Sequence, residues 1–121
     1  MRPLDVAHAW LAAFNGQDAE RIANLYAEDA VIDHIFPDPI RGRSQIRKMF
    51  TKGFAASPLV CIVENLFEAG EWVILEWRDP KGLRGCALFR VVDGLIVFSR
   101  AYWDRIEHMK LHGATALQAA E

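Results

Sequence analysis

The second half of the chain consists of four strand-like runs that only short turns separate. Val, Ile, Phe and Trp dominate these runs, and such residues favour β-strands. Asp93-Gly94 between the last two runs is a strong hairpin signal, and Ala69-Gly70 is a second turn. Because turns this short join antiparallel neighbours, the pattern predicts a meander. The four runs are Val60–Phe67, Trp72–Trp77, Gly85–Val92 and Leu95–Asp104.

The first half carries helical signals instead. Pro3 suits the first turn of one helix, which Asn15-Gly16 ends. Asp18 can cap a second helix, and a third is expected between a cap at Ser44 and the stop at Ser57-Pro58. The apolar residues expected on their inward faces are Val6, Trp10, Ala13 and Phe14, then Ile22, Leu25 and Tyr26, then Ile46, Met49, Phe50 and Phe54.

One more strand is predicted between the second and third helices, over Val31–Phe36, and Pro37 and Pro39 prevent its continuation. Helices followed by antiparallel strands make an α+β fold. Three short helices cover a five-stranded sheet only if that sheet curls around them. Alternation places Ile32, His34 and Phe36 on one face of the strand, and Val31, Asp33 and Ile35 on the other.

Composition limits the class of protein. The chain has 121 residues, of which 52% are hydrophobic and 25% charged, so we expect one packed domain over residues 1–121. Its core should span about residues 4–104, and the C-terminal tail, residues 105–121, can form a short helix. A net charge of −2 lacks the basic footprint of a nucleic-acid-binding protein, so no nucleic acid is expected as a partner.

The sequence also bears on cellular location. No apolar run approaches the roughly 18 residues of a membrane span, so no membrane contact is expected. The N-terminal residues lack the apolar stretch of a signal peptide. Cys61 and Cys86 both lie in strand-like runs, where we expect free thiols. These features favour a cytoplasmic protein.

Strand alternation leaves an outer sheet face that is unusually apolar. On each of the last three strands, the alternate residues of one set carry no charge, and we expect this set to face the helices. The other set contains charged side chains, whose burial would be costly. The outer face exceeds what a monomer normally exposes, so we expect a homodimer through it; scattered surface hydrophobics are the alternative. The inward sets are Val73, Leu75 and Trp77, then Ala87, Phe89 and Val91, then Val97, Ser99, Ala101 and Trp103; the outer residues are Trp72, Ile74, Leu88, Phe98 and Tyr102, with Glu76, Arg78, Arg90 and Arg100 expected to form ion pairs across the interface or around its rim.

Several short motifs occur in a recognisable order: Trp10-x3-Phe14-Asn15, Asp18, Leu25 to Val31, Pro39-x-Arg41-Gly42 with Ile46 and Phe50, and the closing strand. Together they resemble the SnoaL-like branch of the nuclear transport factor 2-like superfamily, over about Leu4 to Asp104. Ketosteroid isomerase, limonene epoxide hydrolase and polyketide cyclases are relatives. The resemblance implies a cystatin-like cone, in which a curved, mostly antiparallel sheet wraps three N-terminal helices and a pocket opens at the wide end. Such proteins are commonly dimers.

The resemblance to ketosteroid isomerase implies three catalytic positions. The position of the oxyanion-binding tyrosine holds Trp10, and the position of the base holds His34. The oxyanion-binding acid falls on Ala87 or Leu88, neither of which can donate a hydrogen bond. The isomerase set is therefore incomplete.

The resemblance to the epoxide hydrolases implies a second set, which is also incomplete because the charged clamp around the water is missing. Asp104 lies three residues beyond one expected carboxylate and would enter the pocket only through a bulge, which makes it a further catalytic candidate. The Tyr, Asn, Arg and two Asp positions of those enzymes hold Ile32, His34, Trp77, Asp79 and Ala101.

The expected pocket has one main titratable group, His34. A buried, neutral imidazole can accept a proton at one nitrogen and donate at the other. We therefore expect a site for a flat, apolar small molecule and, if it is catalytic, cofactor-free isomerisation, cyclisation or hydrolysis with His34 as base. The alternatives are a filled cone, with His34 bonded to the backbone, and a non-catalytic binding or interaction module. The expected ligand-binding residues are Trp10, Phe14, Ile32, Phe50, Phe54, Leu75, Trp77, Ser99, Ala101 and Trp103.

Two histidines near the C-terminus, His108 and His112, have the spacing of two metal ligands on one helix face. Neither an HExxH pattern nor a nearby third ligand accompanies them, so we interpret them as surface histidines on a loose tail and expect no metal. The sequence has no Gly-rich phosphate loop and no nucleophile signature, so no cofactor is expected.

Overall fold

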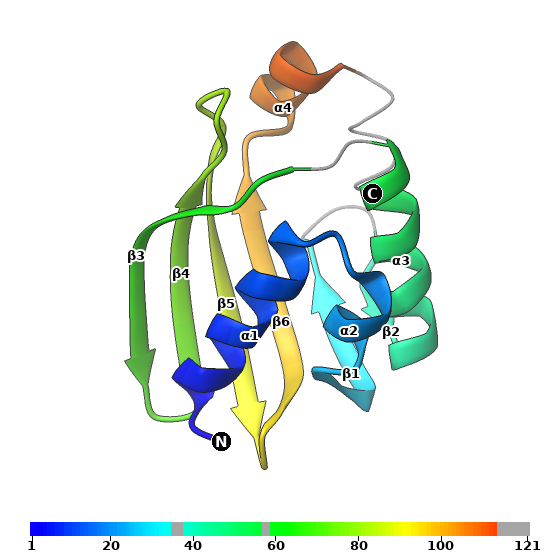
Figure 1. The fold of residues 1–121 in the computed structure, drawn as a ribbon, viewed down its shortest axis with the longest axis vertical. Coiled ribbons are helices and arrows are strands. Elements are labelled where there is room, and N and C mark those ends of the chain that lie inside the picture. Colours follow the sequence, from blue (N-terminus) through cyan, green and yellow to red (C-terminus); the bar gives the residue numbers. More distant parts are fainter. Residues whose placement is uncertain (35–37, 57–58, 114–121) are drawn as a thin grey trace.

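The computed structural model describes residues 1–34, 38–56 and 59–113, and it has the predicted α+β architecture (Figure 1). Ile35 and Phe36, which the sequence places on a strand, lie outside the described residues, as does the predicted helix stop at Ser57-Pro58. The helices are α1 (Pro3–Asn15), α2 (Ala19–Ala23), α3 (Arg43–Ala56) and α4 (Arg105–His112); the strands are β1 (Tyr26–Asp33), β2 (Ile40–Arg41), β3 (Ile62–Ala69), β4 (Trp72–Arg78), β5 (Arg84–Val92) and β6 (Leu95–Trp103).

The strands of the described chain form one six-stranded sheet in the order β2-β1-β6-β5-β4-β3. The predicted antiparallel meander runs from β3 to β6, whereas β1 is a parallel neighbour of β6. The short strand β2, which the sequence analysis did not predict, pairs with β1. Helices α1, α2 and α3 lie on one face of the sheet, and α4, the predicted short tail helix, lies at one end (Figure 1).

The helix starts agree with the predicted signals in two of three cases. Pro3 begins α1, where the Asp5 carboxylate accepts a hydrogen bond from the Arg2 N–H at 3.0 Å. The carboxylate of Asp18 caps α2, accepting from the Arg21 N–H at 3.0 Å. The third prediction was wrong, because α3 already begins at Arg43 and Ser44 is inside it.

Strand β1 begins at Tyr26 rather than at Val31, so Tyr26 belongs to the sheet and not to the second helix. The Ile96 N–H donates to the Leu25 carbonyl at 2.8 Å, and Tyr26 pairs with Ile96. Contacts with β6 therefore outweigh the helical spacing of Ile22, Leu25 and Tyr26.

The predicted inward position of Val97 was also wrong. Arg90 pairs with Phe98 and Val91 pairs with Ile96, which leaves Val97 as the extra residue of a β-bulge. Ile96 is fully buried in its place. Beyond the bulge the predicted parity resumes, with Ser99 buried.

Two other expectations concern cysteines and membranes. Cys61 and Cys86 are free thiols, as predicted, although Cys86 is only half-buried. None of the described helices is long and apolar enough to cross a membrane.

Candidate functional site

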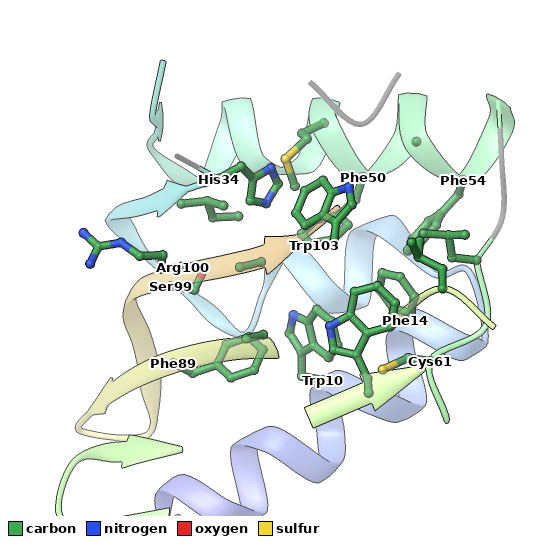
Figure 2. A pocket seen from close by; sticks show the side chains of 18 of the residues that line it. Trp10, Phe14, His34, Phe50, Phe54, Cys61, Phe89, Ser99, Arg100 and Trp103 are labelled. Carbon is green, nitrogen blue, oxygen red and sulfur yellow. The ribbon is translucent and has the colours of Figure 1, made fainter. Parts of the chain in front are cut away.

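A cavity of about 150 Å³ lies between the helices and the sheet (Figure 2). Every predicted ligand-binding residue except Leu75 lines it, and so does His34. Leu75 is fully buried in the hydrophobic core, away from the cavity wall, which corrects that prediction. Residues of the wall that the sequence analysis did not assign to it are Tyr26, Met49, Gly53, Leu59, Val60, Cys61, Leu83, Ala87, Phe89, Arg100 and His108.

Aromatic rings from α1, α3 and β5 support one another around the cavity (Figure 2). Trp10 stacks on Phe14 with ring centroids 4.9 Å apart and contacts Phe89 at 5.0 Å. Phe54 meets Phe14 at 5.5 Å and Phe50 at 5.7 Å. Such mutual contacts fix the rings without filling the space between them.

Trp77 owes its place in the wall to Gly85, its cross-strand partner on β5. A Cβ atom at Gly85 would lie 2.3 Å from the Trp77 ring, closer than real Cβ contacts come. The indole therefore lies directly over the glycine, a close approach that any side chain at this position would prevent.

A buried hydrogen-bonded group connects α1, β1 and β6. The indole Nε1 of Trp10 donates to the Tyr26 hydroxyl at 3.0 Å, and Ser99 also hydrogen-bonds to that hydroxyl. Burial raises the pKa of Tyr26 well above its ordinary value, so the phenol stays neutral. Sequence reasoning missed Tyr26 because it placed this residue on a helix.

His34 follows the end of β1, and its ring lies edge-on to the Trp103 indole with centroids 5.1 Å apart (Figure 2). Its backbone carbonyl accepts a hydrogen bond from Arg105 Nη2 at 2.9 Å, which ties it to the start of α4. His34, Ala101 and Trp103 also line a second, more polar groove of about 600 Å³. His34 therefore stands in a wall that the cavity shares with this groove.

Two aspartates that the family resemblance brought into consideration lie outside the cavity wall. Asp104 caps α4, accepting from the N–H groups of Ile106 at 2.9 Å and Glu107 at 3.0 Å. The carboxylate of Asp79 is fully buried and accepts from the N–H groups of Lys81 and Leu83. The structure assigns both groups roles in local architecture, and Asp104 does not reach the cavity through a bulge.

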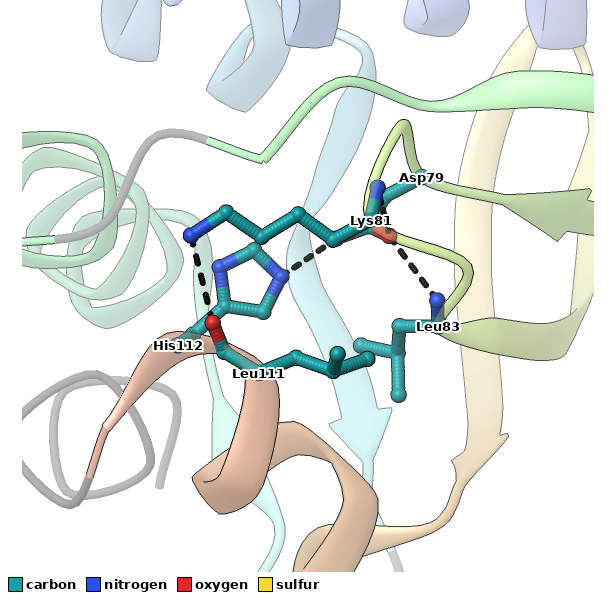
Figure 3. A network of polar contacts seen from close by, with 5 residues as sticks. All are labelled: Asp79, Lys81, Leu83, Leu111 and His112. Carbon is teal, nitrogen blue, oxygen red and sulfur yellow. Dashed lines mark hydrogen bonds and ion pairs between the residues drawn. The ribbon is translucent and has the colours of Figure 1, made fainter.

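Helix α4 corrects the interpretation of the two C-terminal histidines. His108 is only 1% exposed and lines the cavity, and the largely buried His112 contacts the Asp79 carboxylate through Nε2 (Figure 3). Neither is a surface residue on a loose tail. Among the described residues, no group of three or more His, Cys, Asp or Glu side chains could hold a metal ion.

Burial also sets the protonation of two groups in the wall. It raises the pKa of the Cys61 thiol to about 12, so this cysteine is not a nucleophile near neutral pH. Desolvation lowers the pKa of His108, with smaller contributions from His112 and Arg105 in the same direction and from Asp79 in the opposite one. His108 is therefore a neutral imidazole at pH 7.

The lowered pKa of His108 predicts a loss of stability in acid. Between its ordinary value of 6.5 and its lower folded value, the unfolded chain binds a proton more readily than the folded chain. The contribution of neutral His108 to the free energy of unfolding is therefore complete above pH 6.5. It is lost as the pH falls towards the pKa of His108 in the folded chain. Urea unfolding at about pH 7.5 and 5.5 should show a larger loss for the wild type than for His108→Leu. Equal losses would contradict the assignment.

Comparison with known proteins addresses the fold. The model of the SnoaL-like domain family matches residues 7–99. A putative SnoaL-like polyketide cyclase from Jannaschia sp. CCS1 is 17% identical with a TM-score of 0.79, covering 93% of this chain and 92% of its own. An LEH-like epoxide hydrolase of M. tuberculosis is 21% identical with a TM-score of 0.78, covering 98% and 96%.

A third solved structure adds a ligand, though only for that protein. It is a hypothetical protein with a ketosteroid isomerase-like fold from Catenulispora acidiphila DSM 44928, in complex with trimethylamine. It is 20% identical with a TM-score of 0.78, covering 96% of this chain and 97% of its own. No curated protein matches the sequence significantly. The structural neighbours therefore establish the fold, and any activity has to be inferred from the residues of the site.

Proposed function

Because the chain belongs to the SnoaL-like domain family, we propose that it binds a small, largely apolar molecule in the cavity and that His34 acts there as a general base. The observation that carries this proposal is a hollow, lined mainly by aromatic and aliphatic side chains, next to the His34 imidazole. Apolar walls with a few convergent polar groups are typical of small-molecule sites.

The cavity volume limits the size of the ligand. At about 150 Å³ it matches an engineered apolar cavity that binds benzene. A single ring with a short substituent fits this volume, whereas a fused four-ring steroid does not. The proposed ligand is therefore monocyclic.

The residues around His34 favour proton transfer over epoxide opening. Trp77 and Ala101 supply neither the guanidinium nor the carboxylate of a charged clamp. Arg100 lines the cavity, but its guanidinium forms an ion pair with Asp33 at 3.1 Å. An unprotonated His34 can take a proton from the carbon next to a carbonyl group. The C–H electron pair then forms a carbon–carbon double bond and the carbonyl π pair moves to the oxygen, which gives an enolate and a protonated imidazole.

Acetophenone, a monocyclic ketone, tests both halves of this proposal. NMR titration should show saturable binding, and in D₂O the protein should accelerate exchange of the methyl protons above the buffer rate. Binding without exchange would favour a non-catalytic binding module and exclude the base. If neither acetophenone nor toluene binds, the proposed function is wrong.

We also propose that the outer sheet face pairs with a second copy of the chain. Phe67 is 56% and Tyr102 48% exposed on this face, where Trp72 and Phe98 are in ring contact at 6.2 Å. Two of the charges expected to pair across the interface or around its rim form ion pairs within the chain, Arg90 with Glu71 and Arg100 with Asp33. Apolar area would therefore provide most of the association energy. Sedimentation at micromolar concentration should give a dimer, and a monomer would contradict this proposal.

A further inference from the structure

Helix α4 brings a second imidazole, His108, into the cavity wall next to Trp103. The His108 ring centroid lies 6.4 Å from that of Trp103, and Trp103 lies 5.1 Å from His34. Both nitrogens of His108 and the indole nitrogen of Trp103 are buried, without a hydrogen-bond partner among the described residues. Buried polar atoms are rarely left unpaired, because each one costs about 1–3 kcal/mol.

We propose that His108 and Trp103 form the polar end of the cavity and bind an oxygen substituent, best a hydroxyl group, on a monocyclic ligand. This inference rests on the proposed function, since it names the ligand class for the same cavity. A neutral imidazole has one donor and one acceptor nitrogen, and an indole has one donor. A hydroxyl oxygen can accept from such a donor while its proton is donated to the imidazole, whereas a methyl group can do neither.

The fold holds this polar end in place. His112, one turn after His108, contacts the buried carboxylate of Asp79, and Lys81 Nζ donates to the Leu111 carbonyl at 3.1 Å (Figure 3). These contacts fix α4 against the turn between β4 and β5. The unpaired nitrogens of His108 therefore lie on a docked helix and that of Trp103 at the end of β6, and such fixed supports are what a preorganised site requires.

Phenol and toluene provide a matched pair of probes, because they differ by a hydroxyl in place of a methyl group. Calorimetric or NMR titration of the wild-type protein should show phenol binding at least as tightly as toluene. In His108→Leu the affinity for phenol should fall about tenfold, while that for toluene changes by less than about twofold. His8→Leu, the same change at an exposed position on α1, is the matched control and should keep the preference for phenol.

The outcomes separate this inference from the proposed function. If toluene binds and phenol does not, or if His108→Leu leaves the affinity for phenol unchanged, His108 and Trp103 do not bind an oxygen substituent. The proposal that the cavity binds an apolar molecule would still hold. A loss of phenol affinity in His34→Gln alone would place the oxygen at His34 and overturn the inference too. If neither probe binds, both proposals fail. Should His108→Leu not fold, Trp103→Phe removes the indole donor and should also weaken phenol more than toluene.

Discussion

Replacing Asp79 with alanine is expected to lower the free energy of unfolding by about 3–5 kcal/mol. The carboxylate is fully buried and accepts hydrogen bonds from Lys81 N–H at 3.0 Å and Leu83 N–H at 2.9 Å, and it also contacts His112 on α4 (Figure 3). Alanine leaves the buried Leu83 N–H without an acceptor. It also removes the partner of His112, so the turn and the docked helix are weakened together.

Two further variants show whether the carboxylate itself is responsible. Asp79→Asn keeps an oxygen for the two N–H groups and offers an N–H₂ to His112, so its loss should be only about 1 kcal/mol. Lys81→Ala removes the exposed bond from Lys81 to the Leu111 carbonyl and should change stability by at most about 0.5 kcal/mol. Urea unfolding monitored by circular dichroism measures all three variants. If Asp79→Ala lowered the free energy of unfolding no more than Lys81→Ala, the contacts of the Asp79 carboxylate would not be what holds α4 in place.

The parts of the fold that local signals specify were predictable from sequence. Asp93-Gly94 marks the hairpin between β5 and β6, and alternation along β4 places Val73 and Leu75 in the core. Helical spacing likewise placed Phe14 and Phe50 on inward helix faces, and both residues line the cavity. In each case a short stretch of sequence contains both the signal and its structural consequence.

Two errors arose because the deciding contact lies far away in the sequence. Tyr26 follows the helical spacing of Ile22, yet pairing with Ile96 places it in β1. Val97 fits the alternation of β6, yet the register with β5 makes it the extra residue of a bulge. Neither partner is visible within a local window, since strand pairing is a property of the whole sheet.

The buried face of α4 was unpredictable for a different reason. Its hydrophobic residues Ile106 and Met109 are 63% and 41% exposed, whereas His108 is buried and His112 largely so. This reverses the usual amphipathic pattern, so hydropathy places the wrong face inward. The polar inward face is stable because Asp79, itself fully buried, contacts His112. A helix that buries histidines in this way is also the one that supplies the proposed polar end of the cavity.

His34→Gln is expected to lower the acetophenone exchange rate by about a hundredfold or more, the usual contribution of a positioned general base. Glutamine keeps a polar side chain of similar length, but its amide does not take up a proton near neutral pH. His34 is only half-buried, so the variant should stay within about 1 kcal/mol of the wild-type stability and should still bind toluene. His8→Gln, the same change at an exposed position on α1, is the control and should leave exchange unaffected. If His34→Gln exchanged the methyl protons as fast as the wild type, the His34 imidazole would not be the general base. A large loss of stability with unaltered binding would instead make its role structural.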